Sequence, residues 1–245
     1  MDSGIYTAIA GALASQDRID VLSSNLANVN TVGYKRDRYS FESVLASVNN
    51  PTQSDGTLTD PPTMPRMIFE TDYSHGTLRQ SGNPLDVALD GDGFFVVNGP
   101  KGRSYTRQGN FHLDAGGKLV NADGYEVLGT GGPIVIKGGH VEIDQKGAIS
   151  VDGNPVAKLA VVDFPKPYPL QKVGGSLFMS NGSQVTEQPV TSTSVLQGSI
   201  EESNVNAIQE MALLIDGTRN YESCMKAIRT YDDMASKAAN DVGKI

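Results

Sequence analysis

Apolar side chains recur at helical spacing near both ends of the chain and at alternate positions between them. Residues 3–28 place apolar or small side chains at alternating steps of four and three. A stripe of this kind is typical of an amphipathic helix that packs against a partner helix. At a rise of about 1.5 Å per residue, the helix would be roughly 35–40 Å long. Some members of the stripe are small or polar, so we expect a weak dimer interface for this helix alone.

A second helical pattern, longer and more regular, covers residues 204–242. Its seven-residue repeat consists of Leu214, Tyr221, Ile228, Ala235 and Val242. Heptads sustained over this length favour a coiled coil. Asn204 is expected to cap the start of the helix, and Gly243 lies where the helix should end. Gly217 in the interior costs roughly 1 kcal/mol relative to Ala, and it predicts either a close helix contact or a weak point.

Between the helical patterns, turn-forming residues and period-two alternation take over. Residues 46–66 are rich in Pro, Asn, Ser, Thr and Asp, which predicts a loop or a mobile linker. Strands are expected from about residue 67, and Phe94–Val97 is an apolar run typical of a buried strand. Strand signals continue through 158–164. The prolines of 165–169 exclude a central strand there, because proline lacks the N–H donor.

Two short segments of this middle region, 114–124 and 144–153, resemble each other. Each has an Asp, a Gly three residues later and an apolar residue two positions further. This spacing predicts a tight hairpin turn with Gly at the position of positive φ. The element order therefore predicts an α+β fold, in which long coiled-coil-like N- and C-terminal helices flank a mostly antiparallel β-rich central domain.

Charge and composition narrow the classes of partner. The 245 residues carry a formal net charge of −8, which disfavours binding to nucleic acid and to a membrane through a polybasic segment. The first residues lack the cationic region of a cleavable secretory signal. We therefore expect that a route out of the cytoplasm, if the protein uses one, does not depend on such a signal.

The side chains that usually carry chemistry are few and scattered. The histidines, at positions 75, 112 and 140, lack the spacing of metal ligands. Cys224 lies beside the heptad line, where a buried and inert thiol is the simplest interpretation. The stretch DGDGFF at 90–95 has neither the Glu nor the helices of a calcium-binding EF-hand, so a turn between strands is expected. We predict no enzymatic activity, no metal, no cofactor and no small-molecule substrate.

Three separated segments resemble one known family. They are NLANVNTVGYKR at 25–36, NPLDVALDGDGFFVV followed by YTRQGNFHLDAGGKLVNADGYEVLG at 83–129, and SNVNAIQEMALLIDGTRNYESCMKAIRTYDDM at 203–234. In this order they resemble the bacterial flagellar rod and hook family, and the likeness covers nearly the whole chain.

The resemblance implies a structural protein that assembles helically. Its terminal helices would form an inner tube around the export channel, and its β domains would pack outside that tube. The implied domains are an N-terminal helix of the inner assembly domain at 1–35, a connector at 36–75, a β-rich outer domain at 76–198 and a C-terminal helix of the inner domain at 199–245. The implied partners are copies of the chain, other proximal and distal rod proteins, and the flagellar type III export apparatus. The implied location is the periplasm-spanning rod of the basal body.

Candidate assembly residues come from the helical stripes and from the asparagine-rich stretch. They are Ile5, Ile9, Ile19, Asn25, Leu26, Asn28, Thr31, Gly33, Tyr34, Met211, Leu214, Tyr221, Met225 and Ile228. Asn28 and Thr31 could satisfy backbone groups that the ending helix leaves free. Gly33 would permit a turn that other residues resist, and Tyr34 would begin the connector to the β domain.

Two alternatives remain open on the sequence alone. The helices could form an intramolecular hairpin in a monomer, with no contact to other chains. The β domain could also be the working part of a surface binding protein or enzyme, with the helices as its stalk. If the helices need other copies, both ends of the chain should be mobile in the monomer.

Overall fold

The computed structural model describes residues 2–40, 68–180, 186–190 and 193–242. The predicted linker at 46–66 lies outside these residues. The chain divides into two compact units. The helix unit comprises the described residues of 1–27, 37–72 and 206–245, and the β body comprises those of 28–36 and 73–205. Each unit is thus assembled from segments that lie far apart in the sequence.

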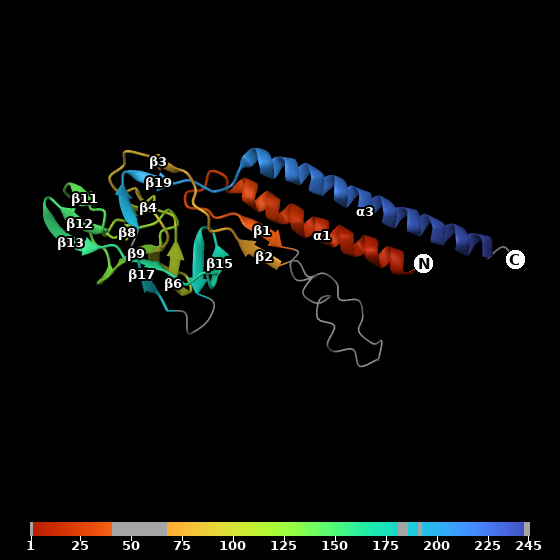
Figure 1. The fold of residues 1–245 in the computed structure, drawn as a ribbon, viewed down its shortest axis with the longest axis horizontal. Helices are drawn as coiled ribbons and strands as arrows, with labels where there is room; N and C mark the ends of the chain where they lie inside the picture. The colour runs from red at the N-terminus through yellow and green to blue at the C-terminus, as the bar shows by residue number, and fades with distance from the viewer. Residues whose placement is uncertain (1, 41–67, 181–185, 191–192, 243–245) are drawn as a thin grey trace. The chain divides into compact units, whose positions relative to one another are not determined.

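The helix unit contains two long helices that run antiparallel beside each other (Figure 1). Helix α1 spans Asp2–Ala27 and helix α3 spans Ala207–Val242. These bounds agree with the helical patterns read from the sequence. An antiparallel hairpin of β1 (Asp37–Ser40) and β2 (Ile68–Thr71) contacts α1. The predicted helices therefore flank the β-rich middle of the chain in sequence and meet each other in space.

Glycines bring the two helices close together. Gly4 lies against Tyr231, Gly11 against Cys224 and Gly217 against Ile19. A Cβ at position 217 would lie 3.2 Å from Cγ1 of Ile19, which is tighter than ordinary van der Waals contact. Of the two interpretations of Gly217, the structure confirms the close helix contact.

The cap of α3 differs from the prediction. The side chain of Asn206 accepts a hydrogen bond from the N–H of Gln209 at 3.2 Å, and its carbonyl accepts one from the N–H of Glu210 at 2.9 Å. The prediction that Asn204 caps this helix is wrong. The side chain of Asn204 instead bonds to Ser74 and to the N–H of Arg36, both in the β body. Asn204 precedes the first residue of α3, Ala207, by three positions, whereas a capping residue directly precedes its helix.

The β body is built almost entirely from antiparallel pairs. Its main sheet orders β15 (Leu170–Gly174), β16 (Leu177–Ser180), β6 (Gly102–Thr106), β5 (Phe94–Gly99), β9 (Glu126–Gly129), β8 (Leu119–Val120) and β7 (His112–Leu113). To this sheet are joined β10 (Gly132–Pro133), β14 (Val161–Asp163) and β17 (Gln188–Pro189).

Smaller sheets complete the β body. They are β11 (Val141–Ile143) with β12 (Ala148–Val151) and β13 (Asn154–Lys158), β4 (Val87–Asp90) with β18 (Ser194–Gln197), and β3 (Leu78–Gln80) with β19 (Ser199–Glu201). Residues 91–93 form the turn between β4 and β5 that was expected in the stretch 90–95, and residues 165–169 contain no strand, as predicted. No helix among the described residues is long and apolar enough to cross a membrane.

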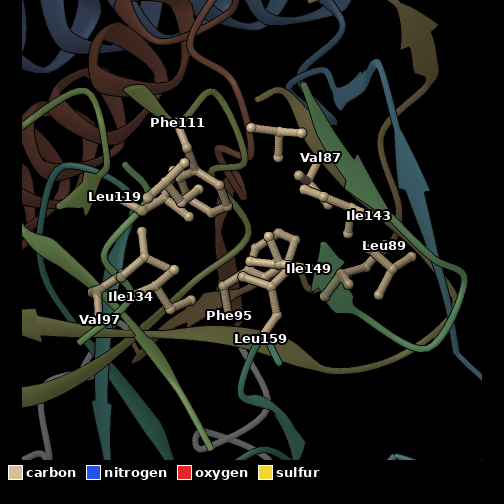
Figure 2. Packing of buried hydrophobic residues seen from close by; sticks show 14 of the residues in the cluster. Val87, Leu89, Phe95, Val97, Phe111, Leu119, Ile134, Ile143, Ile149 and Leu159 are labelled. Carbon is tan, nitrogen blue, oxygen red and sulfur yellow. The ribbon is translucent and has the colours of Figure 1, made fainter. Parts of the chain in front are cut away.

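Strand β5 explains why the apolar run at 94–97 is continuous. Phe95 and Val97 pack into the larger core cluster (Figure 2), whereas Phe94 and Val96 pack into a second cluster on the other side. A strand that is buried on both faces needs apolar residues at every position. A single chain therefore supplies all the side chains that bury both faces of β5 in the core of the β body.

The hairpin turns follow the repeat read from the sequence. The carboxylate of Asp114 accepts the N–H groups of residues 116 and 118, and the carboxylate of Asp144 accepts those of residues 146 and 148, all at 2.7–2.9 Å. Gly117 and Gly147 take φ values of 78° and 76°. Asn121 makes the same pair of bonds, to residues 123 and 125. This third turn has Asn in place of Asp, so the Asp-to-Gly spacing alone does not predict it.

Candidate assembly surface and buried polar junction

Asn25 connects the end of α1 to the start of β1. Its side-chain amide donates to the carbonyl of Asp37 at 2.9 Å, and its Oδ1 accepts the N–H of the same residue at 2.9 Å. Its Nδ2 also lies 3.4 Å from Oε2 of Glu210 on α3. The side chain is 1% exposed. Asn25 therefore joins three elements of the helix unit, which explains an asparagine at a position that otherwise favours better helix formers.

The segment after α1, which is the first part of the β body, contains two successive turns. The N–H and the hydroxyl of Thr31 donate to the carbonyl and to Oδ1 of Asn28, both at 3.1 Å. The N–H of Tyr34 then donates to the carbonyl of Thr31 at 3.3 Å. These contacts give residues 28–34 a defined turn.

Gly33 is required at its position for two reasons. Its φ of 67° lies in the left-handed region that disfavours side chains. An added Cβ would also lie 2.3 Å from the carbonyl carbon of Arg107 and 2.4 Å from the nitrogen of Gln108. Its N–H donates to the carbonyl of Glu201 at 2.8 Å. The structure thus confirms the predicted special turn and adds a close backbone approach.

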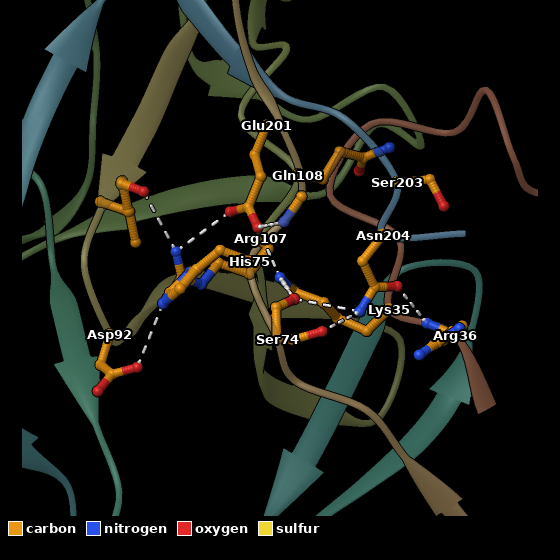
Figure 3. A network of polar contacts seen from close by, with 12 residues as sticks. Lys35, Arg36, Ser74, His75, Asp92, Arg107, Gln108, Glu201, Ser203 and Asn204 are labelled. Atoms are coloured by element: carbon orange, nitrogen blue, oxygen red, sulfur yellow. Dashed lines mark hydrogen bonds and ion pairs between the residues drawn. The ribbon is translucent and has the colours of Figure 1, made fainter. Parts of the chain in front are cut away.

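Three buried charges meet directly after this turn (Figure 3). Lys35 Nζ lies 2.5 Å from Oε1 of Glu201, and Arg107 Nη1 lies 3.1 Å from Oε2 of the same carboxylate. The three side chains are 1–3% exposed. Backbone carbonyls of Ser74 and Gly91 accept further hydrogen bonds from Lys35 at 2.8 Å and from Arg107 at 2.6 Å. We call these three residues the polar junction.

The electrostatics of the polar junction keep Glu201 ionised. Burial by itself would raise the pKa of the Glu201 carboxyl, but the charges of Lys35 and Arg107 outweigh this effect and hold the pKa below its ordinary value. The N–H of Gly76 adds a hydrogen bond to Oε1 at 3.0 Å. A buried charge that is paired on both oxygens is tolerated, whereas one that lost its partners would be costly.

Tyr34 is held beside the polar junction. Its side chain is 2% exposed, and Nζ of Lys172 lies 4.0 Å from the ring centroid. The same ammonium donates to the carbonyl of Lys35 at 2.8 Å. Lys172 is half-buried, and a cation over an aromatic face is worth about 0.5–1 kcal/mol at exposed sites and about 2 kcal/mol when fully desolvated. This contact fixes the N-terminal connector on the β body.

Sequence reasoning did not single out the polar junction. Lys35 and Arg107 lie inside the segments that resemble the rod and hook family, but nothing local distinguishes them from solvated surface cations. Glu201 ends the short strand β19. The only signal in the sequence is a charge at the end of an otherwise uncharged strand, and that signal is weak.

The structure places the predicted assembly residues in three environments. Asn25, Gly33 and Tyr34 are buried inside their own chain. Ile9 and Met211 are exposed. The remaining members are half-buried: Ile5, Ile19, Leu26, Asn28, Thr31, Leu214, Tyr221, Met225 and Ile228. Ile19 lies in the contact between α1 and α3, so part of the predicted stripe packs within one chain. That these residues meet other subunits stays a prediction.

The largest exposed apolar side chains of the helix unit were not among the predicted residues. Tyr6 is 63% exposed and Leu13 is 56% exposed on α1, while Ile208 is 81% exposed and Ile215 is 52% exposed on α3. Isolated apolar residues on a surface are ordinary, but runs along one helix face usually mark an interaction surface. The outer faces of both helices are therefore the candidate assembly surface.

The described residues offer little for catalysis. His75 lies 3.5 Å from Asp92 and His140 lies 3.7 Å from Glu142, and all four side chains are substantially exposed. No group of three or more His, Cys, Asp or Glu among the described residues could hold a metal ion. Cys224 is half-buried against Gly11.

A pocket of about 620 Å³ lies beside β14 in the β body. Four charged residues line it: Arg103, Lys146, Lys158 and Glu187. Two of them, Arg103 and Glu187, are bonded to each other at 2.6 and 2.8 Å. Tyr105 donates to the same carboxylate at 2.7 Å, and burial together with Glu187 raises the pKa of Tyr105 to about 12. Arg103, Tyr105 and Glu187 therefore form a structural ion-pair cluster at one side of the pocket.

Comparison with known families and proteins agrees with this geometry. Three family models match in order: "Flagella basal body rod protein" over residues 5–35, "Flagellar hook protein FlgE/F/G D1 domain" over 88–151, and "Flagellar basal body rod FlgEFG protein C-terminal" over 196–241. The first covers most of α1 and the third most of α3. The middle model covers a large part of the β body.

Similar proteins match along nearly their full length. The flagellar basal-body rod protein FlgF of Rhizobium meliloti is 32% identical, with 99% of each chain covered. The rod protein FlgG of Bacillus subtilis is 32% identical, with 96% of this chain and 97% of the relative covered. FlgF of Caulobacter vibrioides is 28% identical over the whole of both chains. The chain therefore belongs to the flagellar basal-body rod protein family.

Proposed function

We propose that the chain is a structural subunit of the flagellar basal-body rod, of the proximal F type, and that it acts in the hollow drive shaft that transmits torque and conducts exported subunits. One observation carries the proposal most strongly. The β body closes its core within one chain, whereas the helix unit leaves large apolar side chains on the outer faces of α1 and α3. This division fits a subunit whose helices are completed by neighbouring chains.

In this proposal, the terminal helices pack as a coiled-coil-like layer that forms an inner tube, with the β bodies outside it. The inner assembly domain is formed by residues 1–35 and 199–245, the connector by 36–75 and the outer domain by 76–198. The seven-residue repeat of α3 supports such packing. The polar junction supports a mechanical role, because it ties Lys35, at the end of the N-terminal segment 1–35, and the last strand, β19, to the same β body.

The proposed partners are copies of the chain and other rod proteins, both proximal and distal, together with the flagellar type III export apparatus. The proposed location is the rod, which spans the periplasm. Export as an unfolded chain would suit the fold, since the helix unit combines the two ends of the chain and can form only after the whole chain has passed.

A distal rod protein of the G type is the second candidate. Relatives named FlgF and FlgG reach the same identity of 32% with this chain. The opening Met1-Asp2, followed by Ile5-Tyr6-Thr7-Ala8, resembles the F type more closely. The rod genes that neighbour this one in its operon separate the two candidates, because a separate G-type gene beside it would leave the F-type role for this chain.

The test is deletion of the gene, followed by swimming assays and by detection of the protein in purified basal bodies of the parent strain. Loss of swimming, with the protein present in the rod fraction, is the expected result. Normal swimming, or absence of the protein from basal bodies, would contradict a rod function and would favour a surface protein that uses the same fold.

A further inference from the structure

The chain passes between the helix unit and the β body four times: after residues 27, 36, 72 and 205. Units joined by free linkers move relative to each other by default. In this chain, however, the β body binds the last three crossings to one another on its own side. The segments that do so are 34–36, 74–76 and 201–204, and each lies within a few residues of its crossing.

Asn204 bonds to both of the other segments (Figure 3). Its Oδ1 accepts the N–H of Arg36 at 2.8 Å, and its backbone N–H donates to the carbonyl of Tyr34 at 3.4 Å. Its Nδ2 donates to the carbonyl and to the hydroxyl of Ser74, both at 3.1 Å. An amide side chain carries an acceptor and two donors in one planar group, so this single residue can hold two other segments at once.

The same three segments are also packed backbone against backbone. A Cβ added at Gly76 would lie 1.8 Å from the carbonyl oxygen of Glu202, so a side chain is excluded there. The N–H of Gly76 donates to Oε1 of Glu201 at 3.0 Å. Lys35 bonds to the same carboxylate at 2.5 Å and to the carbonyl of Ser74 at 2.8 Å. Each segment is therefore bonded to both of the others.

We propose that Asn204 clamps three of the four crossings into one rigid exit from the β body. We call segments 34–36, 74–76 and 201–204 the exit clamp. This inference rests on the proposed rod function, and it names the device through which a β body passes torque into the segments that lead to its helices. A single strand rotates about two soft dihedrals per residue, whereas three strands that are bonded side by side cannot rotate independently.

The side chain of Asn204 matters for the rigidity of the exit clamp more than for folding. Asn204 is half-buried, and a hydrogen bond at such a position adds little net stability because water replaces it on unfolding. The core clusters and the polar junction do not depend on it. Removal of the side chain should therefore loosen the exit clamp in a β body that stays folded.

The experiment compares two substitutions of Asn204 in the full-length chain. Asn204→Ala removes both ends of the amide. Asn204→Asp keeps an acceptor for Arg36, but it presents a second acceptor to Ser74 in place of the donor. Asn83→Ala is the matched control, since the amide of Asn83 also bonds at both ends, at 3.1 and 3.2 Å, but only within residues 83–86.

The first readout is hydrogen exchange at two amides that Asn204 does not bond. Gly33 and Gly76 donate to the carbonyl and to the side chain of Glu201, so a merely local role of Asn204 would leave both unchanged. In Asn204→Ala both amides should exchange about tenfold faster or more, while β5 and β6 keep their protection. Asn204→Asp should release Gly76 and leave Gly33 protected. Asn83→Ala should match the unaltered chain.

The second readout is motility of the deletion strain that produces each variant. Asn204→Ala should enter basal bodies in the normal amount. Its swimming speed in viscous medium should nevertheless fall about twofold, because loosened crossings leave the two units mobile relative to each other. Asn83→Ala should swim as the parent strain does.

Unchanged exchange at Gly76 in Asn204→Ala would overturn the exit clamp, and so would fast exchange with normal swimming in viscous medium. Loss of protection in β5, or a reduced amount in basal bodies, would also overturn it, because Asn204 would then act in folding or in assembly. Absence of the unaltered chain from basal bodies would instead count against the proposed rod function, whereas the exchange rates of the purified chain do not depend on that function.

Discussion

In the β body, strand β5 buries both of its faces, and the charged side chains that enter the interior meet partners from the same chain. In the helix unit, each helix buries one face against the other and leaves apolar residues such as Leu13 and Ile208 in solvent. Stability is therefore distributed unevenly. The first region is complete as a single chain, whereas the second resembles half of an interface, and changes in the two regions should have different consequences.

The largest effect is expected at the polar junction. Glu201→Gln would leave Lys35 and Arg107 buried without a carboxylate, and breaking a buried ion pair in this way costs about 3–5 kcal/mol. The free energy of unfolding of the β body is measured by urea denaturation of the purified chain. The matched control is Glu202→Gln, since Glu202 pairs with Arg79 at the surface at 2.7 Å. Its cost should be about 0–1 kcal/mol. Equal losses in the two variants would refute the role of the polar junction.

Gly33→Ala should have the next largest effect. The substitution combines a strained φ with a clash against the backbone at residues 107 and 108, so we expect a loss of about 3 kcal/mol. Gly82→Ala separates the two causes. Gly82 has a φ of 77° but nothing within 4 Å of an added Cβ, and its loss should be about 1 kcal/mol. Similar urea midpoints for the two variants would show that the close approach at Gly33 is not required.

Acid should weaken the β body through Glu201. Because the pKa of Glu201 in the folded chain lies below its ordinary value of 4.5, the stabilisation is present above that value and is lost as pH falls through the folded pKa. Urea midpoints measured from pH 7 down to pH 3 should fall below about pH 4.5. The fall should be shallower in Glu201→Gln, which lacks the titrating group. An identical pH profile in both proteins would assign the acid sensitivity to other carboxyls.

The smallest effect on stability is expected on the outer helix faces. Leu13→Ser and Ile208→Ser replace exposed side chains, so the free energy of unfolding of the purified chain should change by no more than about 0.5 kcal/mol. Incorporation into basal bodies should nevertheless fall. Phe95→Ala provides the contrast, because truncating a buried core phenylalanine costs about 3–5 kcal/mol. Normal incorporation of both Ser variants would remove the helix faces from the assembly surface.

The sequence predicts the local features of this fold well. Helical periodicity locates α1 and α3 within a few residues, the Asp-to-Gly spacing locates the turns at 114–117 and 144–147, and the apolar run identifies β5. Each of these features depends on residues close together in the chain. Gly33 also belongs to this class, since a glycine inside a turn-forming stretch suggests positive φ.

The features that sequence reasoning missed depend on distant residues. Lys35 and Glu201 are separated by 166 positions, and no local pattern indicates that they meet. The choice of Asn206 over Asn204 as the cap of α3 follows from contacts of Asn204 with Ser74. The apolar stripe of α1 reveals a buried face, but periodicity does not distinguish a partner helix in the same chain from one in another chain. The exposed outer faces of α1 and α3 can be identified only from a structure in which the inner faces of the two helices pack against each other.

Hydrogen exchange of the dilute purified chain, followed by mass spectrometry, tests most directly whether the helix unit is incomplete in a single chain. We expect amides of residues 5–25 and 208–235 to exchange much faster than those of β5 and β6 in the same molecules, and to become protected in assembled basal bodies. Protection of both helices equal to that of β5 in the dilute chain would contradict this expectation, because the helix unit would then be as complete as the β body.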